Sequence, residues 1–375
     1  MRVLICSDRM GPLSSAQAGR ALALGWPGAQ VRTAGEAGAG FVEATADGWE
    51  APLQRAVLDG LPVESAVSAA GAAVVGVSRL RAPAGDNSPI PYHASSAVLG
   101  RAVASILREY RPRRLLVDLA GLDVHDGGAG LLAELGAHGE GGDLDAGVAG
   151  LGGLDAVNLD EVRRSLAGVE LVGVVPTAQR DDLLLGLRGI TSRRGRAAGE
   201  DVAGLLATDS ALEQFTGLVA AELTSVPGAG AAGGLGWAVL ALGGTLATGP
   251  ELALAAVQAG LDLVVTGCSL FDFASRGGGV VAMAAALAAD RLCPCIVIAG
   301  EVLIGGREMR TMGVEAAYAI RESRADIATG AGLTETELAP YAAERDEKHI
   351  FPRESLHKAG ELGLGGVYIR EDFGG

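Results

Sequence analysis

The sequence has few aromatic residues and few cysteines for its length. Its 375 residues include three tryptophans, five tyrosines and six phenylalanines, against 58 glycines. The apolar half of the composition therefore consists mainly of small and aliphatic side chains, which predicts Ala-rich helices and Val-rich or Leu-rich strands joined by tight glycine turns. The four cysteines are too few and too irregularly spaced for a disulfide framework or a zinc cluster; they are Cys6, Cys268, Cys293 and Cys295.

Positive charge and long apolar runs are also scarce. The chain carries 30 Lys and Arg residues against 45 Asp and Glu residues, a formal charge of −15, whereas the binding of nucleic acid relies on clustered basic side chains. No apolar stretch approaches the roughly 20 residues of a membrane span, and the N-terminus lacks the pattern of a secretory signal. We expect a cytoplasmic protein with neither nucleic acid nor a membrane as its partner.

What the chain does contain is an alternation of short Val, Leu and Ile runs with longer Ala-rich and Leu-rich segments. This alternation predicts an α/β fold with a largely parallel sheet. The expected strands are residues 2–6, 72–77, 113–120, 169–175, 261–267 and 293–300. The expected helices are residues 14–25, with Ser14 or Ser15 as the cap, and 95–110, 210–224, 251–260 and 279–290. The stretch 136–160 is rich in Gly and Asp, so we expect it to be irregular.

A glycine loop follows the strand expected at 113–120. Residues 126–130 read Asp-Gly-Gly-Ala-Gly, which places Asp126 at the C-terminal edge of a strand, where ligands collect in open α/β sheets. A carboxylate there can hold a metal ion or accept a proton from a hydroxyl group. It can equally cap the following helix by accepting hydrogen bonds from backbone N–H groups. The sequence leaves both interpretations open.

A second glycine loop, at residues 228–236, contains the spacing G-x-G-x-x-G at Gly228, Gly230 and Gly233. The dinucleotide-binding interpretation of that spacing requires a preceding strand. Here the preceding residues have helical spacing and end in Pro227, so the context excludes it. Two interpretations remain: an anion site formed by backbone N–H groups at a helix N-terminus, or a close packing contact that only glycine permits.

The order of these motifs resembles that of the bacterial class I glycerate kinases, from Met1 to about Glu344. The two loops are followed by "LDLVVTG" at 261–267 and "IVIAGEV" at 296–302. The resemblance implies two α/β domains, a Rossmann-like domain built from residues 1–75 and 264–345 and an inserted domain at 76–263. The charged tail, 346–375, is expected to be peripheral. The implied activity is ATP-dependent phosphorylation of glycerate in the cleft, with Mg²⁺.

The same resemblance implies roles for individual residues. Asp126 and Asp272 take the catalytic positions, and Asp8 and Asp181 are the carboxylates assigned to the metal. The residues assigned to substrate or phosphate are Gly127, Gly128, Gly130, Gly228, Gly230, Gly233, Gly234, Thr266 and Gly267.

Several charged residues of the family pattern are missing. Three lysine positions are occupied by Gly11, Ala198 and Gly279, and two carboxylate positions by Ala39 and Cys268, while Glu36 stands for an Asp. The loop before Asp126, normally small and hydroxyl residues ending in Asn, reads Leu-Asp-Val-His at 122–125. Four arginines supply charge nearby, Arg9, Arg194, Arg196 and Arg276, although Arg is not a geometric equivalent of Lys.

Phosphoryl transfer depends on positioned cations and on carboxylates that hold the metal. We therefore favour a family member without catalysis, which serves as a ligand sensor or binds a protein partner. The alternative is an active kinase that uses ATP and a small hydroxy acid such as glycerate, with Asp126 as base or metal ligand and Asp272 as second carboxylate.

Overall fold

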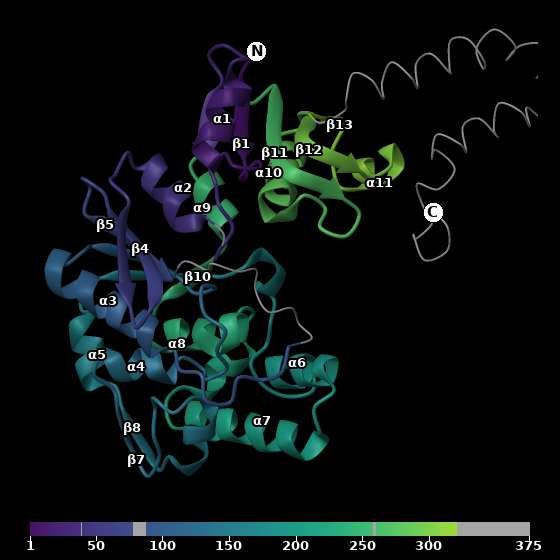
Figure 1. The fold of residues 1–375 in the computed structure, drawn as a ribbon. Coiled ribbons are helices and arrows are strands. Elements are labelled where there is room, and N and C mark those ends of the chain that lie inside the picture. Colours follow the sequence, from purple (N-terminus) through teal and green to yellow (C-terminus); the bar gives the residue numbers. More distant parts are fainter. Residues whose placement is uncertain (39, 78–87, 258–259, 321–375) are drawn as a thin grey trace, which may run out of the picture. The chain divides into compact units, whose positions relative to one another are not determined.

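The computed structural model describes residues 1–38, 40–77, 88–257 and 260–320 (Figure 1). By its internal contacts the chain divides into Met1–Tyr318 and Ala319–Gly375. Apart from Ala319 at the end of the last strand, all the described elements lie in the first unit. The tail expected at 346–375 and the substituted position Ala39 lie outside the described residues.

A five-stranded sheet has the order β13-β12-β11-β1-β2. The pairs β1–β2, β1–β11 and β11–β12 are parallel. Its strands are β1 (Val3–Ser7), β2 (Gln30–Thr33), β11 (Leu263–Asp272), β12 (Cys295–Leu303) and β13 (Ala316–Ala319), and its helices are α1 (Ser15–Ala23), α10 (Gly278–Asp290) and α11 (Gly306–Thr311). Strands from the start and the end of the described chain share this sheet, which confirms the Rossmann-like arrangement.

A six-stranded sheet has the order β10-β9-β6-β5-β4-β3. The strands from β10 to β5 are parallel, whereas β4 is antiparallel to both of its neighbours. They are β3 (Gln54–Leu58), β4 (Leu61–Val67), β5 (Ala72–Val77), β6 (Arg114–Asp118), β9 (Glu170–Val174) and β10 (Thr245–Ala247). The helices of this part are α2 (Phe41–Gly48), α3 (Ala97–Tyr110), α4 (Ala129–Glu134), α5 (Asp160–Ser165), α6 (Ile190–Ala198), α7 (Val202–Gly217) and α8 (Leu235–Ala241). Helix α9 (Gly249–Leu254) follows β10 and contacts α10 and β2 of the five-stranded part. The chain thus forms the two α/β domains that were expected.

All six strands expected from the sequence are present, as β1, β5, β6, β9, β11 and β12. Helix α1 begins after Ser14, whose hydroxyl accepts a hydrogen bond from the Gln17 N–H while the Gln17 side chain accepts one from the Ser14 N–H. This reciprocal pair is a capping box, and it fixes where the helix starts. The helix expected at 210–224 is instead divided, because α7 ends at Gly217 and a 3₁₀ turn, Ala221–Ser225, follows.

The chain changes sheets earlier than the boundary expected at residue 75. Strands β3 and β4 precede that boundary and β5 spans it, yet all three pair within the six-stranded sheet. Helix α2 belongs to the same core, where Phe41 and Val42 join Val74 and Leu116. The crossing therefore lies between Thr33 and Phe41, and the return lies between β10 and β11. The boundary was misplaced because an apolar pattern in a sequence indicates that a strand is buried, but it does not reveal which sheet the strand joins.

The two crossing segments touch each other. A Cβ atom added to Gly249, at the start of α9, would overlap the carbonyl oxygen of Gly35 and lie 2.8 Å from a ring carbon of Phe41. Helix α2 contacts β2 of one sheet and β4 and β5 of the other, and α9 also contacts β2. Figure 1 shows α2 and α9 between the strands of the two sheets. Glycine at 35 and 249 allows this backbone contact where the chain passes from one sheet to the other.

The expectation that residues 136–160 are irregular is wrong. This stretch forms a short antiparallel hairpin, β7 (His138–Glu140) with β8 (Ala156–Asn158), and a 3₁₀ helix, Val148–Gly153. Its leucines, Leu144, Leu151, Leu154 and Leu159, are buried in the largest hydrophobic core, and this apolar burial stabilises the glycine-rich segment. None of the helices in the described ranges combines the length and the apolarity that crossing a bilayer requires.

Candidate functional site

Carboxylates gather where strands β1, β2 and β6 end. Asp8 follows β1, Glu36 lies shortly after β2, and Asp118 is the last residue of β6. Burial raises the pKa of Asp8 to about 6, with the Glu36 charge adding to the rise and the hydrogen bond from the Arg9 N–H opposing it. Burial likewise raises the pKa of Asp118 to about 6, against hydrogen bonds from the N–H groups of Gly38 and Ala120. The Glu36 charge raises both values, so these carboxylates share one electrostatic environment.

Glu36, which follows β2 of the five-stranded sheet, is bonded to Thr177, which follows β9 of the six-stranded sheet. Its Oε1 accepts a hydrogen bond from the Thr177 N–H at 3.0 Å, and its Oε2 accepts one from the Thr177 hydroxyl at 2.8 Å. A Cβ atom added to Gly279, near the start of α10, would overlap both Glu36 Oε2 and Thr177 Oγ1. Gly279 occupies a position where the resemblance predicts a lysine. In this chain the Glu36–Thr177 pair fills the space through which that lysine side chain would leave the backbone.

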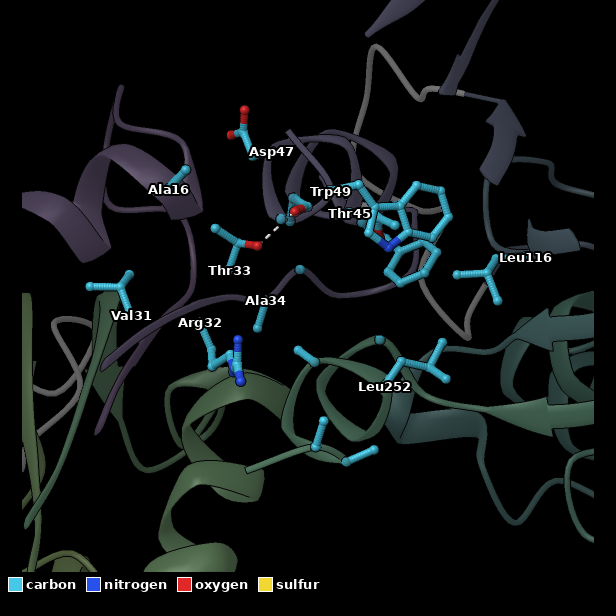
Figure 2. Close-up of a pocket in the computed structure, with 18 of the residues that line it drawn as sticks. Ala16, Val31, Arg32, Thr33, Ala34, Thr45, Asp47, Trp49, Leu116 and Leu252 are labelled. Carbon is cyan, nitrogen blue, oxygen red and sulfur yellow. Dashed lines mark hydrogen bonds between the residues drawn. The ribbon is translucent and has the colours of Figure 1, made fainter. Parts of the chain in front are cut away.

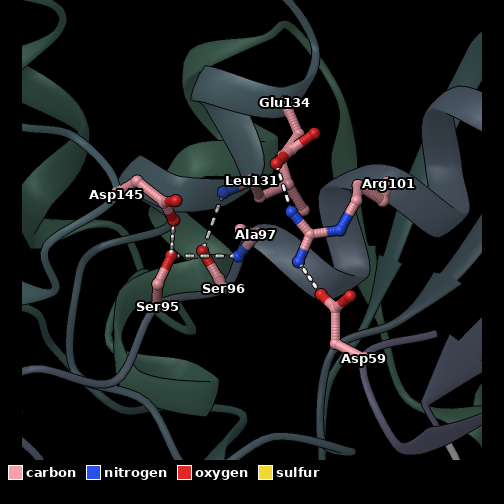
Figure 3. Close-up of polar contacts among 8 residues, drawn as sticks. All are labelled: Asp59, Ser95, Ser96, Ala97, Arg101, Leu131, Glu134 and Asp145. Atoms are coloured by element: carbon pink, nitrogen blue, oxygen red, sulfur yellow. Dashed lines mark hydrogen bonds and ion pairs between the residues drawn. The ribbon is translucent and has the colours of Figure 1, made fainter.

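Asp126 is completely buried, and its carboxylate is occupied by the protein itself. Oδ1 accepts from the Gly128 N–H at 3.0 Å, and Oδ2 accepts from the Gly130 N–H at 3.2 Å. The N–H and hydroxyl of Ser96 also donate to Oδ2, at 2.8 and 2.7 Å. The Ser96 oxygen in turn accepts from the Leu131 N–H (Figure 3). Asp126 therefore fastens the start of α4 to the start of α3, the capping role that the sequence left open.

The two glycine loops pack against each other, backbone on backbone. The Gly127 N–H donates to the Gly233 carbonyl at 3.0 Å. A Cβ atom on Gly233 would overlap the Val124 carbonyl oxygen, and one on Gly234 would lie 2.7 Å from the Gly127 Cα. A Cβ atom on Gly128 would overlap the Ala238 Cβ of α8. These contacts support close packing as the reason for the glycines.

The other glycines assigned to phosphate have similar surroundings. A Cβ atom on Gly130 would overlap the Ser95 hydroxyl oxygen, and one on Gly230 would overlap the Leu183 carbonyl oxygen. On Gly228 it would lie 2.9 Å from Leu246. All three glycines are buried, so their surroundings are already occupied by protein atoms.

The residues that the resemblance assigns along β11 lie in different surroundings. Thr266 is completely buried in the middle of the strand, and a Cβ on Gly267 would lie 2.7 Å from both Met10 Sδ and Ser7 Oγ. Asp272 ends the strand and accepts hydrogen bonds from the Ser275 N–H at 2.7 Å and the Ser275 hydroxyl at 2.6 Å. The Ser275 hydroxyl and N–H lower the pKa of Asp272. Asp272 thus stabilises the turn that follows β11 of the five-stranded sheet, whereas Asp126 follows β6 of the six-stranded sheet.

The carboxylates assigned to the metal do not form a metal cluster. Asp181 is exposed, whereas its neighbour Asp182 is buried and paired with Arg193. In the described parts of the chain, no three His, Cys, Asp or Glu side chains come together in a way that could hold a metal ion.

Three of the four nearby arginines are engaged elsewhere. Arg194 forms an ion pair with Asp123 at 2.9 Å and donates to backbone carbonyl oxygens. Arg196 donates to Ser192 and to the carbonyl oxygen of Leu187. Arg276 lies over the ring of Phe273, 5.7 Å from its centre. Arg9 alone lies at the carboxylates, beside Asp8.

His125, which stands where the family has a polar loop residue, is also a structural residue. It is buried, and its Nε2 lies 2.9 Å from the Thr191 hydroxyl oxygen. Burial and the positive charge of Arg194 lower the pKa of His125 to about 3. The imidazole is therefore neutral at physiological pH and is not available as a general acid.

Sequence reasoning missed Asp118 and Thr177. Asp118 lies inside the apolar run expected as a strand, and a lone carboxylate at the end of a buried strand was the signal that could have identified it. Thr177 had no such signal, because its role depends on a contact with a residue 141 positions away.

Comparisons with known proteins find similarity to glycerate kinases over most of the chain. The model of the glycerate kinase family matches residues 3–344. An uncharacterised protein of Mycobacterium bovis is 31% identical over 351 residues, which cover 86% of this chain and 84% of that protein. The glycerate kinase of Bacillus subtilis is 26% identical over 348 residues, 85% of this chain and 90% of that enzyme.

The structural comparison gives the same fold. A crystal structure of a putative glycerate kinase 2 from Salmonella typhimurium LT2 superposes with a TM-score of 0.67 at 22% identity, covering 94% of this chain and all of that one. A second family model, for the N-terminal domain of acyl-CoA dehydrogenases, matches residues 322–375. That stretch lies outside the described residues and includes the charged tail, 346–375, that was expected to be peripheral.

Proposed function

The chain belongs to the glycerate kinase family, and from that premise we propose that it keeps the family fold without transferring phosphate. The observation that carries this proposal is the Glu36–Thr177 pair against Gly279. A lysine side chain at 279 would collide with that pair. A carboxylate and a hydroxyl therefore occupy the place where the family pattern has a cation for the substrate's negative charge.

The electrostatics of the carboxylate group support the same proposal. Removal of one group that stabilises transition-state charge costs about 10²- to 10³-fold in kcat, and here three lysine positions are empty of charge at Gly11, Ala198 and Gly279. The pKa values of Asp8 and Asp118 are raised mainly by burial, and the nearby Glu36 charge adds to both shifts. A triphosphate would add more negative charge to this environment.

The fit of ATP with Mg²⁺ to these residues is poor. Mg²⁺ in kinases is bound through one or two carboxylates together with the phosphates of the nucleotide. Both oxygens of Glu36 accept hydrogen bonds from Thr177, and both oxygens of Asp118 accept hydrogen bonds from the Gly38 N–H. Asp8 accepts one from the Arg9 N–H. We assign no catalytic step through the metal for this reason, and we propose that the protein acts by binding a small ligand or a protein partner.

A specific observation favours an active kinase as the second candidate. A carboxylate with a pKa of about 6 is well suited to accept a proton from a substrate hydroxyl near neutral pH, and Asp8 has that value at the carboxyl end of β1. This candidate acts on glycerate or a related small hydroxy acid with ATP and Mg²⁺, and it uses Asp8 in place of Asp126 as the base.

A coupled assay of ADP release with ATP, Mg²⁺ and D-glycerate separates the two candidates. The proposal expects no turnover above background for the full chain, and Asp8→Asn leaves that background unchanged. Turnover that Asp8→Asn abolishes and that Asp181→Asn, at an exposed carboxylate, leaves intact would establish the kinase instead. Titration calorimetry with ATP then tells whether a protein without turnover still binds nucleotide.

A further inference from the structure

A cavity of about 620 Å³ lies beside the crossing between the sheets. Its walls come from α1, β2, α2, α9 and β6, which supply lining residues such as Ala16, Thr33 and Leu116 (Figure 2). Both touching glycines, Gly35 and Gly249, also line it. Cavities of roughly 300–1,000 Å³ accommodate small organic molecules. Asp8, Glu36, Thr177 and Asp126 do not line it, so it is separate from the carboxylate group described above.

One guanidinium group in this cavity has no partner. The Nε atom of Arg32, on β2, is buried without a hydrogen bond, and no ion pair or side-chain hydrogen bond of Arg32 occurs among the described residues. Figure 2 shows the Arg32 side chain within the cavity and Asp47 well away from it. Arg32 as a whole is only partly buried, but its buried guanidinium nitrogen without a partner is unfavourable, and a bound carboxylate or phosphate would relieve that cost through charge-assisted hydrogen bonds.

The other lining residues include charged and apolar side chains. Arg20 and Arg114 line the cavity together with the acids Asp47 and Glu50, and all four are exposed, so water screens their charges; Arg114 also pairs with Glu170 at 3.3 Å. Of the lining arginines, Arg32 alone is partly buried. The apolar lining residues Phe41, Trp49, Leu116 and Leu252 are partly or fully buried.

We propose that this cavity binds a small organic anion. Its carboxylate or phosphate group pairs with Arg32, and its apolar part lies against Trp49 and Leu252. Because the ligand touches α2, α9 and both crossing segments at once, binding stabilises the packing at Gly35 and Gly249. The cavity is thus a ligand site of its own, independent of whether the family reaction takes place in this chain.

The test uses four small probes on the full chain. Benzoate and phenyl phosphate carry both an anionic group and a ring; inorganic phosphate lacks the ring, and phenol lacks the anionic group. Binding is followed by the fluorescence of Trp49, with Trp49→Phe to identify its signal, and by isothermal titration calorimetry. We expect saturable binding of at least one ring-bearing anion and at least tenfold weaker binding of phosphate and phenol. The stronger of the two ring-bearing anions identifies the anionic group.

Arg32→Gln should weaken that binding at least tenfold, since a hydrogen bond to a charged group contributes about that much. Arg55→Gln is the matched control, because it removes the same charge from an exposed side chain on β3 that pairs with Glu64 outside the cavity. Arg32→Lys keeps the charge without the forked donor and should give an intermediate loss, which covers the case in which Arg32→Gln does not fold. The proposal is overturned if none of the four probes binds, or if both Arg32 variants bind like the unaltered chain.

Discussion

Replacing Asp126 distinguishes an anchor of the fold from a catalytic carboxylate. Asp126→Ala removes the acceptor for the N–H groups of Ser96, Gly128 and Gly130 and for the Ser96 hydroxyl. Each buried donor left without a partner costs about 1–3 kcal/mol. With partial relaxation of the loop, we expect a loss of about 3–6 kcal/mol, a large share of the roughly 5–15 kcal/mol that stabilises an ordinary domain.

The measurement is chemical denaturation followed by circular dichroism, with three variants compared. Asp126→Asn should lose less than Asp126→Ala, because the amide oxygen still accepts from part of the same set of donors. Asp272→Ala is the control, since Asp272 is bonded only to its own turn and should cost about 1 kcal/mol. A loss below about 1 kcal/mol for Asp126→Ala would refute the anchoring role and return Asp126 to the list of candidate catalytic groups.

Three further predictions concern acidity and glycine. The pKa of Asp118 in the folded chain is raised from 3.8 to about 6 by burial, so the folded state holds the proton more tightly and stability falls as pH rises from about 4 to about 6. Asp118→Asn should make this fall in thermal stability smaller, leaving the part that Asp8, whose pKa is also raised to about 6, contributes; an unchanged pH profile would contradict the assignment. Gly279→Ala should destabilise the protein by about 1–3 kcal/mol, because its Cβ displaces Glu36 and Thr177; unchanged urea denaturation would show that the space is free. Gly233→Ala should cost more than Gly199→Ala, although both glycines have positive φ, since only Gly233 abuts backbone, at Val124; equal shifts in melting temperature would count against loop-on-loop packing.

The sequence predicted the strands whose two faces are both buried. Residues 72–77 are continuously apolar, and residues 115–120 are apolar apart from Asp118, as expected in parallel sheets covered by helices; they became β5 and most of β6. Strands β2 and β3 were missed because β2 is only half-buried along its length and β3 is largely exposed. Their sequences consequently lack a long apolar run.

The site was predictable only as a set of segments. The motifs indicated the two glycine loops and Asp126 as parts of one site, but their chemistry was open because packing and anion binding require the same residue types. Tertiary contacts decide between them: Gly127 bonds to Gly233, and Asp126 bonds to Ser96. The position of Thr177 beside Glu36 could not be predicted, since it depends on how two separate connections meet.

The packing of the two glycine loops has a consequence for assigning activities from sequence. Every substitution that adds a side chain at Gly128, Gly233 or Gly234 meets the opposite loop or its helix, so selection for folding alone is sufficient to preserve both motifs. The family lysines are under no such constraint, because they serve the reaction. A chain can therefore lose the family's catalytic activity and still retain the glycine motifs. The motifs indicate that a protein descends from the family, but they do not show that it is an active enzyme.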